Sequence, residues 1–232
     1  MFTKKAWLVI GVLLTTLVGS SDALPPKSGH LTDAEVVQYI RTGDYNGSLL
    51  AQLALARDYL DMRIKLNELQ PQSEQKKLAV VAAVDNTALA HEPRLRNIFV
   101  HVPMQEGELW QTDEPVIWAF RTFYDYVLSK NIAVFFVTAR PEQSRAITEH
   151  NLSREGYQKW QGLWMRPAHC GLSIVDEKVR ERTEIEQKGY AIVLNIGSKL
   201  SDLQGGHSAK VVLLPEPDTH RVRSLDGLNT LI

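Results

Sequence analysis

Cysteine is almost absent from this sequence of 232 residues, which contains only Cys170. A single cysteine excludes an intramolecular disulfide and argues against a thiolate zinc site, which needs several sulfur ligands. We expect Cys170 to be a small buried or half-buried apolar residue. Histidine pairs with ligand-like spacing are also missing, so the sequence predicts no zinc site (His91, His101, His150, His169 and His207).

An excess of charge of one sign is missing too, because 26 Lys and Arg residues are balanced by 27 Asp and Glu residues. No nucleic-acid partner is therefore expected. The sequence also lacks repeats, low-complexity tracts and a glycine-rich phosphate loop, since Gly205-Gly206 has the pattern of an isolated turn. We interpret the tryptophans as core or pocket-rim residues rather than a platform for stacked bases (Trp110, Trp118, Trp160 and Trp164).

A membrane-spanning helix needs about 20 apolar residues, and no apolar run in the sequence is that long. The run at residues 6–18 follows Lys4 and Lys5 and precedes small residues at Ser21 and Ala23. This is the pattern of a secretory signal peptide. We predict cleavage after Ala23, no stable membrane anchor afterwards, and a secreted or periplasmic location. The alternative is an anchor that remains uncleaved.

Short apolar runs alternate with amphipathic stretches along the rest of the chain, whose length and 44% hydrophobic content suit one domain with a sizeable core. The alternation predicts an α/β, Rossmann-like fold, with a parallel sheet flanked by helices. Strands are predicted at residues 78–84, 133–137, 191–196 and 211–214. Helices are predicted at residues 32–43, 48–66, from Glu114-Pro115 with Asp113 as the cap, 141–153 and 177–188.

Polar side chains follow three of the predicted strands. Asp85, Thr138 and Asp202 lie just beyond strand ends, and Lys178 lies on the helix before the third strand. Ligands of parallel sheets bind beyond the carboxyl ends of the strands. A hydroxyl that donates to a phosphoryl oxygen and an ammonium that neutralises charge suit a phosphate site. Two nearby arginines are instead expected to form salt bridges on a helix face (Arg140 and Arg145 with Glu142 and Glu149).

The sequence motifs around these residues resemble those of the haloacid-dehalogenase (HAD) superfamily, subfamily IIIB. This subfamily holds the class B-like acid phosphatases of bacteria and the plant proteins similar to vegetative storage proteins. The resemblance covers essentially all of the chain after residue 23, and the segments that carry it are VVAAVDNTAL (80–89), FFVTARPE (135–142), Lys178 eleven residues before Gly189, NIG (195–197) and SDLQGG (201–206). It implies Mg²⁺-dependent hydrolysis of a small phosphorylated molecule through an aspartyl-phosphate. It also implies a signal peptide (1–23), an N-terminal helical extension (24–72) and a phosphatase core (73–232) with an insertion at about 90–112.

Two departures from the family pattern bear on activity. Ala83 stands where the family has its nucleophilic aspartate, and Ser198 stands at the first acidic position of the last motif. In the family these two carboxylates are the side-chain ligands of Mg²⁺, so no metal site is intact and no cofactor is expected, with Mg²⁺ required only if the protein is active. The resemblance leaves Asp85 as the general acid/base. It assigns phosphate binding to Thr138 and Lys178, and a supporting carboxylate to Asp202.

Three hypotheses follow from this combination. The favoured one is a pseudophosphatase that keeps the fold and a phosphate-sized pocket but has little or no turnover, since a methyl group cannot attack phosphorus. The second is an active acid phosphatase in which Asp85 is the nucleophile, with Thr87 two residues further on. The third is a structural or storage protein that binds no phosphorylated ligand.

Overall fold

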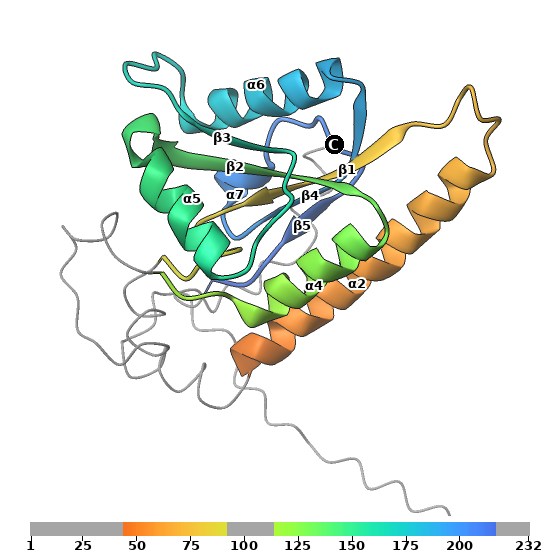
Figure 1. Ribbon diagram of the computed structural model, residues 1–232, viewed down its shortest axis with the longest axis horizontal. Helices are drawn as coiled ribbons and strands as arrows, with labels where there is room; N and C mark the ends of the chain where they lie inside the picture. The colour runs from red at the N-terminus through yellow and green to blue at the C-terminus, as the bar shows by residue number, and fades with distance from the viewer. Residues whose placement is uncertain (1–43, 92–113, 217–232) are drawn as a thin grey trace, which may run out of the picture.

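The computed structural model describes residues 44–91 and 114–216, and it contains a five-stranded sheet of order β3-β2-β1-β4-β5 (Figure 1). Each neighbouring pair of strands is parallel, so all the carboxyl ends lie at one edge of the sheet. The strands are β1 (Lys77–Ala83), β2 (Ala133–Pro141), β3 (Gly162–Arg166), β4 (Tyr190–Gly197) and β5 (Val211–Leu213). The predicted α/β fold with a parallel sheet is confirmed.

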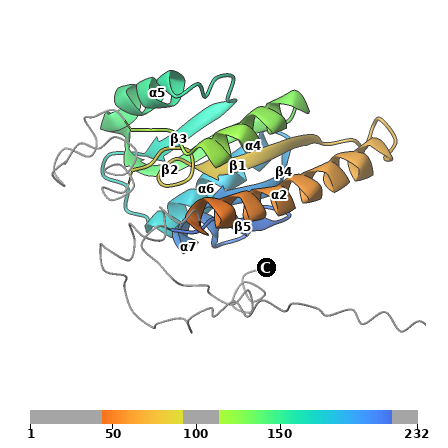
Figure 2. The ribbon, with the colours of Figure 1, turned by 90° about the horizontal axis from the view of Figure 1, so that it is seen from below.

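Helices cover both faces of this sheet. The long α2 (Asp44–Glu68) and α4 (Trp118–Ser129) lie side by side on one face (Figures 1 and 2). On the other face, α6 (Ile174–Gln187) packs against β2 and β4, next to the short α7 (Leu200–Leu203). A single 3₁₀ turn (Glu142–Ser144) leads into α5 (Arg145–Arg154). Within the described ranges, no helix combines the length and apolar character that a membrane crossing requires.

The side chains of β1 alternate between two apolar cores, as the period of a strand dictates. Val80 and Ala82 face the larger core under α2 and α4, whereas Ala79 and Val81 face the smaller core under α6. Burial on both faces explains why this strand reads as an uninterrupted apolar run. Packing on both faces therefore fixes the position of β1 and of its last residues at the edge of the sheet.

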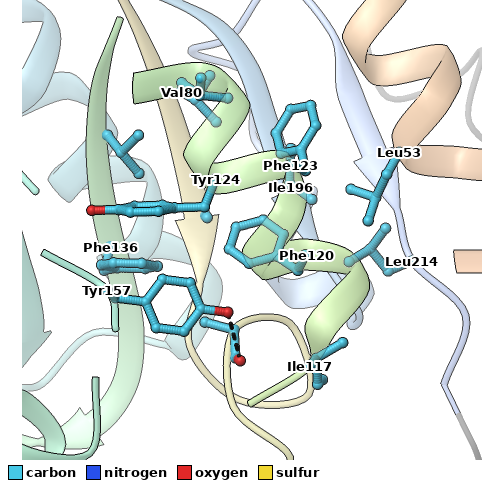
Figure 3. Close-up of a cluster of buried hydrophobic side chains, with 14 of the residues drawn as sticks. Leu53, Val80, Ile117, Phe120, Phe123, Tyr124, Phe136, Tyr157, Ile196 and Leu214 are labelled. Carbon is cyan, nitrogen blue, oxygen red and sulfur yellow. Dashed lines mark hydrogen bonds between the residues drawn. The ribbon is translucent and has the colours of Figure 1, made fainter. Parts of the chain in front are cut away.

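An aromatic cluster in the larger core fixes the loop that follows β1. The ring of Tyr157 packs edge-to-face on Tyr124 and Phe136, with centroids 5.0 and 5.7 Å away. Its hydroxyl donates a 2.9 Å hydrogen bond to the carbonyl of Ala88 (Figure 3). Because the tyrosine is fully buried, this bond ties the loop at residues 84–90 to the core.

The helix predicted from Glu114-Pro115 begins later, at Trp118. Residues 115–117 are instead extended and pair with residues 88–90, through Ala90 N–H to Pro115 O at 2.9 Å and Ile117 N–H to Ala88 O at 3.0 Å. That pairing occupies backbone groups that a first helical turn would have used. Trp118 is 68% exposed, so its assignment to the core or pocket rim is wrong.

Other elements differ less from expectation. Strand β3 was not predicted, because Gly162–Arg166 is short and has polar and glycine neighbours. Helix α6 begins three residues before the predicted start, at Ile174, where the Ser173 side chain accepts from the Asp176 backbone N–H. The signal peptide, the helix at 32–43, Asp113 and all but the first two residues of the insertion at about 90–112 lie outside the described residues. The proposed division into domains stays a prediction. Residues of α2 share the larger core with the sheet.

Candidate functional site

The carboxyl edge of the sheet carries a pocket of about 270 Å³. All four residues that the sequence singled out border it: Asp85, Thr138, Lys178 and Asp202. Parallel strands bring them together, because β1, β2 and β4 are neighbours and end at the same edge. Other residues on the pocket wall are Ala83, His91, Arg140, Lys199 and Ser201.

The resemblance to the family predicts that Ala83 and Ser198 stand at its two metal-binding positions. Ala83 is the last residue of β1, and it lines the pocket with nothing more reactive than a methyl group. Ser198 is buried directly after β4, and its hydroxyl donates to the backbone carbonyl of Asp85 at 3.3 Å. This hydrogen bond links the segments that follow β1 and β4 directly.

Both carboxylate oxygens of Asp85 are already occupied. Oδ1 accepts from Arg140 Nε at 2.9 Å and Nη2 at 2.8 Å, and Oδ2 accepts from the Thr138 hydroxyl at 2.9 Å. Burial raises the pKa of Asp85, but the charges of Arg140 and His91 and the hydrogen bonds from Arg140 and Thr138 outweigh it. The net result is a pKa lowered from 3.8 to about 2. Asp85 is therefore a carboxylate at neutral pH.

Arg140 is the centre of a buried charge network rather than part of a helix-face salt bridge. Its Nη2 also contacts Glu114 Oε2 at 2.6 Å, and Nη1 donates to Thr148 at 3.3 Å. Burial lowers the pKa of Arg140, yet Asp85 and Glu114 more than compensate and the pKa is raised. The predicted pairing of Arg140 with a helix glutamate is wrong, because the side chain points inward from the end of β2.

Arg145 behaves as predicted and shows the contrast. It is on the surface of α5, where Nε and Nη1 contact Glu142 and Glu149. Hydrogen bonding to Glu142 raises its pKa, against the opposing effect of burial. The two arginines are five residues apart, but only Arg140 lies on β2 and is buried.

His91 and Glu114 belong to the site, although no motif in the sequence points to them. His91 Nδ1 lies 2.6 Å from Glu114 Oε1 and 3.5 Å from Asp85 Oδ1. Ligand atoms of these three residues lie within 4.8 Å of one another, a spacing that a metal ion could bridge. Arg140 Nη2 contacts both carboxylates of the group, so a guanidinium already supplies the positive charge there. Their separation along the chain, at positions 85, 91 and 114, hides the cluster from motif searches.

The second half of the pocket is built around Asp202. Its Oδ1 accepts from the ammonium of Lys178, and its Oδ2 accepts from the backbone N–H of Lys199 at 2.9 Å. Gly197 permits this approach, since a Cβ built there would lie 2.4 Å from the Asp202 Cβ. Lys178 and Asp202 are both buried, and together they neutralise each other at the pocket floor.

Arg182 shapes the same half of the site and was missed by the sequence reading. From α6 it donates to three backbone carbonyls of α7 and the turn that follows α7: those of Asp202 at 3.1 Å, Gly206 at 3.0 Å and Gln204. Burial lowers the pKa of Arg182, although Glu181 and Asp202 act in the opposite direction. The guanidinium thus positions α7, which carries Asp202.

The residues at this edge do not fit the Mg²⁺ ion of related phosphatases. Mg²⁺ binds hard oxygen ligands and usually takes carboxylates. Ala83 offers no donor atom, and Ser198 offers a neutral hydroxyl that is already hydrogen-bonded. Of the carboxylates nearby, Asp85 and Glu114 contact Arg140, and Asp202 contacts Lys178. No reaction step through the metal follows from this arrangement.

Comparisons with known proteins agree with the fold and the motifs. The family model described as "HAD superfamily, subfamily IIIB (Acid phosphatase)" matches residues 30–221. A class C acid phosphatase from Bacillus anthracis with tungstate bound superposes with a TM-score of 0.60 at 18% identity, covering 81% of this chain and 85% of that one. At this identity the likeness supports the fold alone.

Curated relatives come from plants. The stem 31 kDa glycoprotein of Glycine max is 32% identical over 148 residues, which cover 60% of this chain and 51% of the relative. Acid phosphatase 1 of Solanum lycopersicum is 31% identical over 105 residues, 44% of this chain and 41% of the relative. Vegetative storage protein 1 of Arabidopsis thaliana is 32% identical over 94 residues, 40% of this chain and 35% of the relative. The chain thus spans about half the length of these relatives, or less.

The predicted family is confirmed by the match over most of the sequence: the chain belongs to the HAD superfamily, subfamily IIIB, the acid phosphatase family.

Proposed function

We propose that this chain is an exported, phosphomonoester-binding member of its family that does not hydrolyse its ligand. One observation carries the proposal: the pocket wall presents the Ala83 methyl beside an Asp85 whose two oxygens are already hydrogen-bonded. A methyl group has no lone pair with which to attack phosphorus. Export rests on the signal-peptide pattern of residues 1–23.

Asp85 is also unsuited to the role of general acid. A group that protonates a leaving oxygen must hold a proton near the working pH. The pKa of Asp85 is lowered to about 2, because Arg140, His91 and Thr138 stabilise its charged form more than burial disfavours it. The carboxylate therefore has no proton to give at neutral pH.

The groups that face a phosphate are nevertheless present. The Thr138 hydroxyl and the Lys178 ammonium border the pocket from β2 and α6, and exposed Lys199 borders it as well. Lys178 gives one N–H to Asp202 and keeps two for a tetrahedral oxyanion, and the Thr138 hydroxyl would turn its one proton from Asp85 Oδ2 to the ligand. Because the carboxylates that would hold Mg²⁺ are missing or occupied, we propose that binding does not depend on a metal.

Asp85 as a nucleophile remains the rival account. Its ionised state would suit attack on phosphorus, but attack requires the carboxylate to leave both nitrogens of Arg140 and the hydroxyl of Thr138. The storage hypothesis has support from the names of relatives alone, which include vegetative storage proteins. The two experiments below separate these accounts.

The first experiment measures turnover of a generic aryl phosphate with Mg²⁺. We expect no activity above background for the wild type, and measurable activity for the Ala83→Asp, Ser198→Asp double variant, which restores both carboxylates. Asp85→Asn is the companion variant. Wild-type turnover that disappears in Asp85→Asn would establish the rival account.

The second experiment measures binding of inorganic phosphate by calorimetry in the presence of a metal chelator. We expect wild-type binding, weakened about tenfold in Thr138→Val, since a hydrogen bond to a charged ligand contributes about 1.5 kcal/mol or more. Thr122→Val is the matched control, because the Thr122 hydroxyl is on the exposed face of α4. Absence of wild-type binding would favour a storage role. Amino-terminal sequencing of the secreted protein tests export, with Leu24 as the expected first residue.

A further inference from the structure

The Thr138 hydroxyl has a single proton, for which Asp85 and a bound phosphate would compete. Thr138 donates this proton to Asp85 Oδ2 at 2.9 Å, and among the described residues it is the donor to that oxygen. The hydroxyl oxygen itself accepts from the backbone N–H of Arg140 at 3.2 Å. Because a hydroxyl can donate only once, a hydrogen bond from Thr138 to a phosphate oxygen removes the one that Asp85 Oδ2 accepts.

Asp85 stays ionised when Thr138 turns away. Its other oxygen, Oδ1, accepts from Arg140 Nε at 2.9 Å and from Nη2 at 2.8 Å, and neither bond involves Thr138. The Arg140 side chain is 1% exposed and that of Asp85 is 19% exposed, so little water weakens the pair. Burial raises the pKa of Asp85, but the charge of Arg140 makes the largest contribution that lowers it, to about 2. Oδ2 therefore remains an acceptor on a charged group.

A ligand that carries its own proton can replace the lost donor. A ligand in the pocket would cover Asp85 Oδ2, and a covered acceptor on a charged group is costly when no donor reaches it. A P–OH group can donate to Oδ2 while a second oxygen of the same phosphate accepts from Thr138. Thr138 Oγ1 and Asp85 Oδ2 are 2.9 Å apart, close to the spacing of two oxygens on one phosphorus atom. One phosphate group can therefore reach both residues.

The fixed charges around the pocket also favour a protonated ligand. As many carboxylates as lysine and arginine side chains lie at the pocket wall or directly behind it (Asp85, Asp202 and Glu114; Arg140, Lys178 and Lys199). His91 Nδ1 lies 3.5 Å from Asp85 Oδ1 and adds a positive charge when the ring is protonated. A doubly charged phosphate would lie beside the Asp85 carboxylate, and a nearby like charge favours the form with fewer charges.

We propose that the pocket selects phosphate groups that carry a proton: the singly charged monoester binds with its P–OH donating to Asp85 Oδ2, whereas the dianion and sulfate are rejected. This inference rests on the proposed phosphate binding and adds the protonation state of the ligand. The titrating group is the ligand, since a phosphomonoester loses its second proton at about pH 6. Binding of a monoester should therefore weaken as the pH rises above that value.

The test compares three ligands that differ in their protons. Methylphosphonate, which has no ester bond to hydrolyse, loses its last P–OH between about pH 5 and pH 9, whereas inorganic phosphate keeps one and sulfate has none. Calorimetry on the purified protein with a chelator present measures each affinity. We expect methylphosphonate to weaken at least about tenfold relative to inorganic phosphate over this range, and sulfate to bind at least about tenfold more weakly than phosphate at both ends. Inorganic phosphate corrects for titration of groups on the protein.

Asp85→Asn reverses the selection. An amide can present an N–H to the ligand where Asp85 presents Oδ2, so it suits an oxygen without a proton. We expect the variant to bind sulfate at least about tenfold more tightly than the wild type does, and to lose the dependence of the methylphosphonate-to-phosphate ratio on pH. Asp125→Asn is the matched control, because Asp125 is exposed on α4 and pairs with Arg121 there. It should leave all affinities unchanged.

The outcomes separate this inference from the proposed function. Wild-type protein that binds sulfate as tightly as phosphate, or a methylphosphonate-to-phosphate ratio that is constant with pH, would overturn the selection and leave phosphate binding standing. Absence of any binding of inorganic phosphate would overturn both. The wild-type comparison decides the question alone if the Asp85→Asn protein does not fold.

Discussion

Replacing Arg140 by methionine removes the guanidinium that contacts both Asp85 Oδ1 and Glu114 Oε2. Arg140 and Glu114 are almost fully buried, so the variant leaves both carboxylates beside the His91 imidazole but without the guanidinium, in a low-dielectric setting. Breaking a buried ion pair on one side typically costs about 3–5 kcal/mol. We expect Arg140→Met to lower the free energy of unfolding at pH 7 by that amount.

The pKa of Asp85 gives a second route to the magnitude. The pKa falls from 3.8 in the unfolded reference to about 2 in the fold. Burial raises the pKa, and the charge of Arg140 makes the largest contribution that lowers it. At about 1.4 kcal/mol for each pH unit, this shift corresponds to about 2 kcal/mol. Because the folded-state pKa is the lower one, the stabilisation is complete above pH about 4 and is lost as the pH falls towards 2. Loss of the Glu114 contact adds to it.

Urea unfolding followed by tryptophan fluorescence at pH 7 and at pH 2 measures both effects. The wild type should lose the Asp85 contribution between pH 4 and pH 2, and the deficit of Arg140→Met should shrink over the same interval. Arg145→Met is the matched control: its ion pairs are on the surface of α5, and we expect a loss below about 1 kcal/mol. If Arg140→Met were as stable at pH 7 as the control, the reasoning about the buried network would be refuted.

Gly197→Ala should destabilise the protein by about 1–3 kcal/mol and weaken phosphate binding, since the added Cβ would lie 2.4 Å from the Asp202 Cβ. Thermal unfolding and calorimetry measure the two effects, and no change in either would contradict the close contact between Gly197 and Asp202. Burial chiefly raises the pKa of Glu181 to about 8, with Glu177 adding to it, so the wild type should lose stability as the pH rises from about 4.5 to 8. Glu181→Gln should remove this slope and unfold at higher urea than the wild type at pH 8 but not at pH 4; identical pH profiles would count against it.

The sheet could be predicted because four of its strands are marked by short apolar runs between amphipathic helices. Burial on both faces leaves this signature in β1, where Ala79 to Ala82 alternate between two cores without any polar residue. Strand β3 lies at the sheet edge and contains Trp164 and Arg166 in only five residues, so no such run announces it. The start of α4 was misplaced because a tertiary pairing with residues 88–90 outweighed a local proline signal.

Apart from Lys178, only the pocket residues at or near the ends of predicted strands could be predicted from the sequence. Asp85 and Asp202 come after strands and Thr138 lies near the end of β2, and the three converge because parallel strands end together. His91 and Glu114 reach the site from either end of a segment 22 residues long, and nothing in their local sequence points inward. Arg140 has glutamates nearby in sequence, but burial at the end of β2 gives it different partners. Such contacts depend on tertiary structure rather than on spacing.

The most direct test measures phosphate release from an aryl phosphate, once with Mg²⁺ and once with a chelator. It asks whether a site with alanine at the end of β1 has lost its hydrolytic activity. We predict that the wild-type rate equals that of buffer under both conditions. A rate that rises with Mg²⁺ and depends on Asp85 would contradict the account, because Asp85 would then have to leave Arg140 and Thr138 to attack phosphorus, and a metal ion would have to bind without carboxylates at positions 83 and 198.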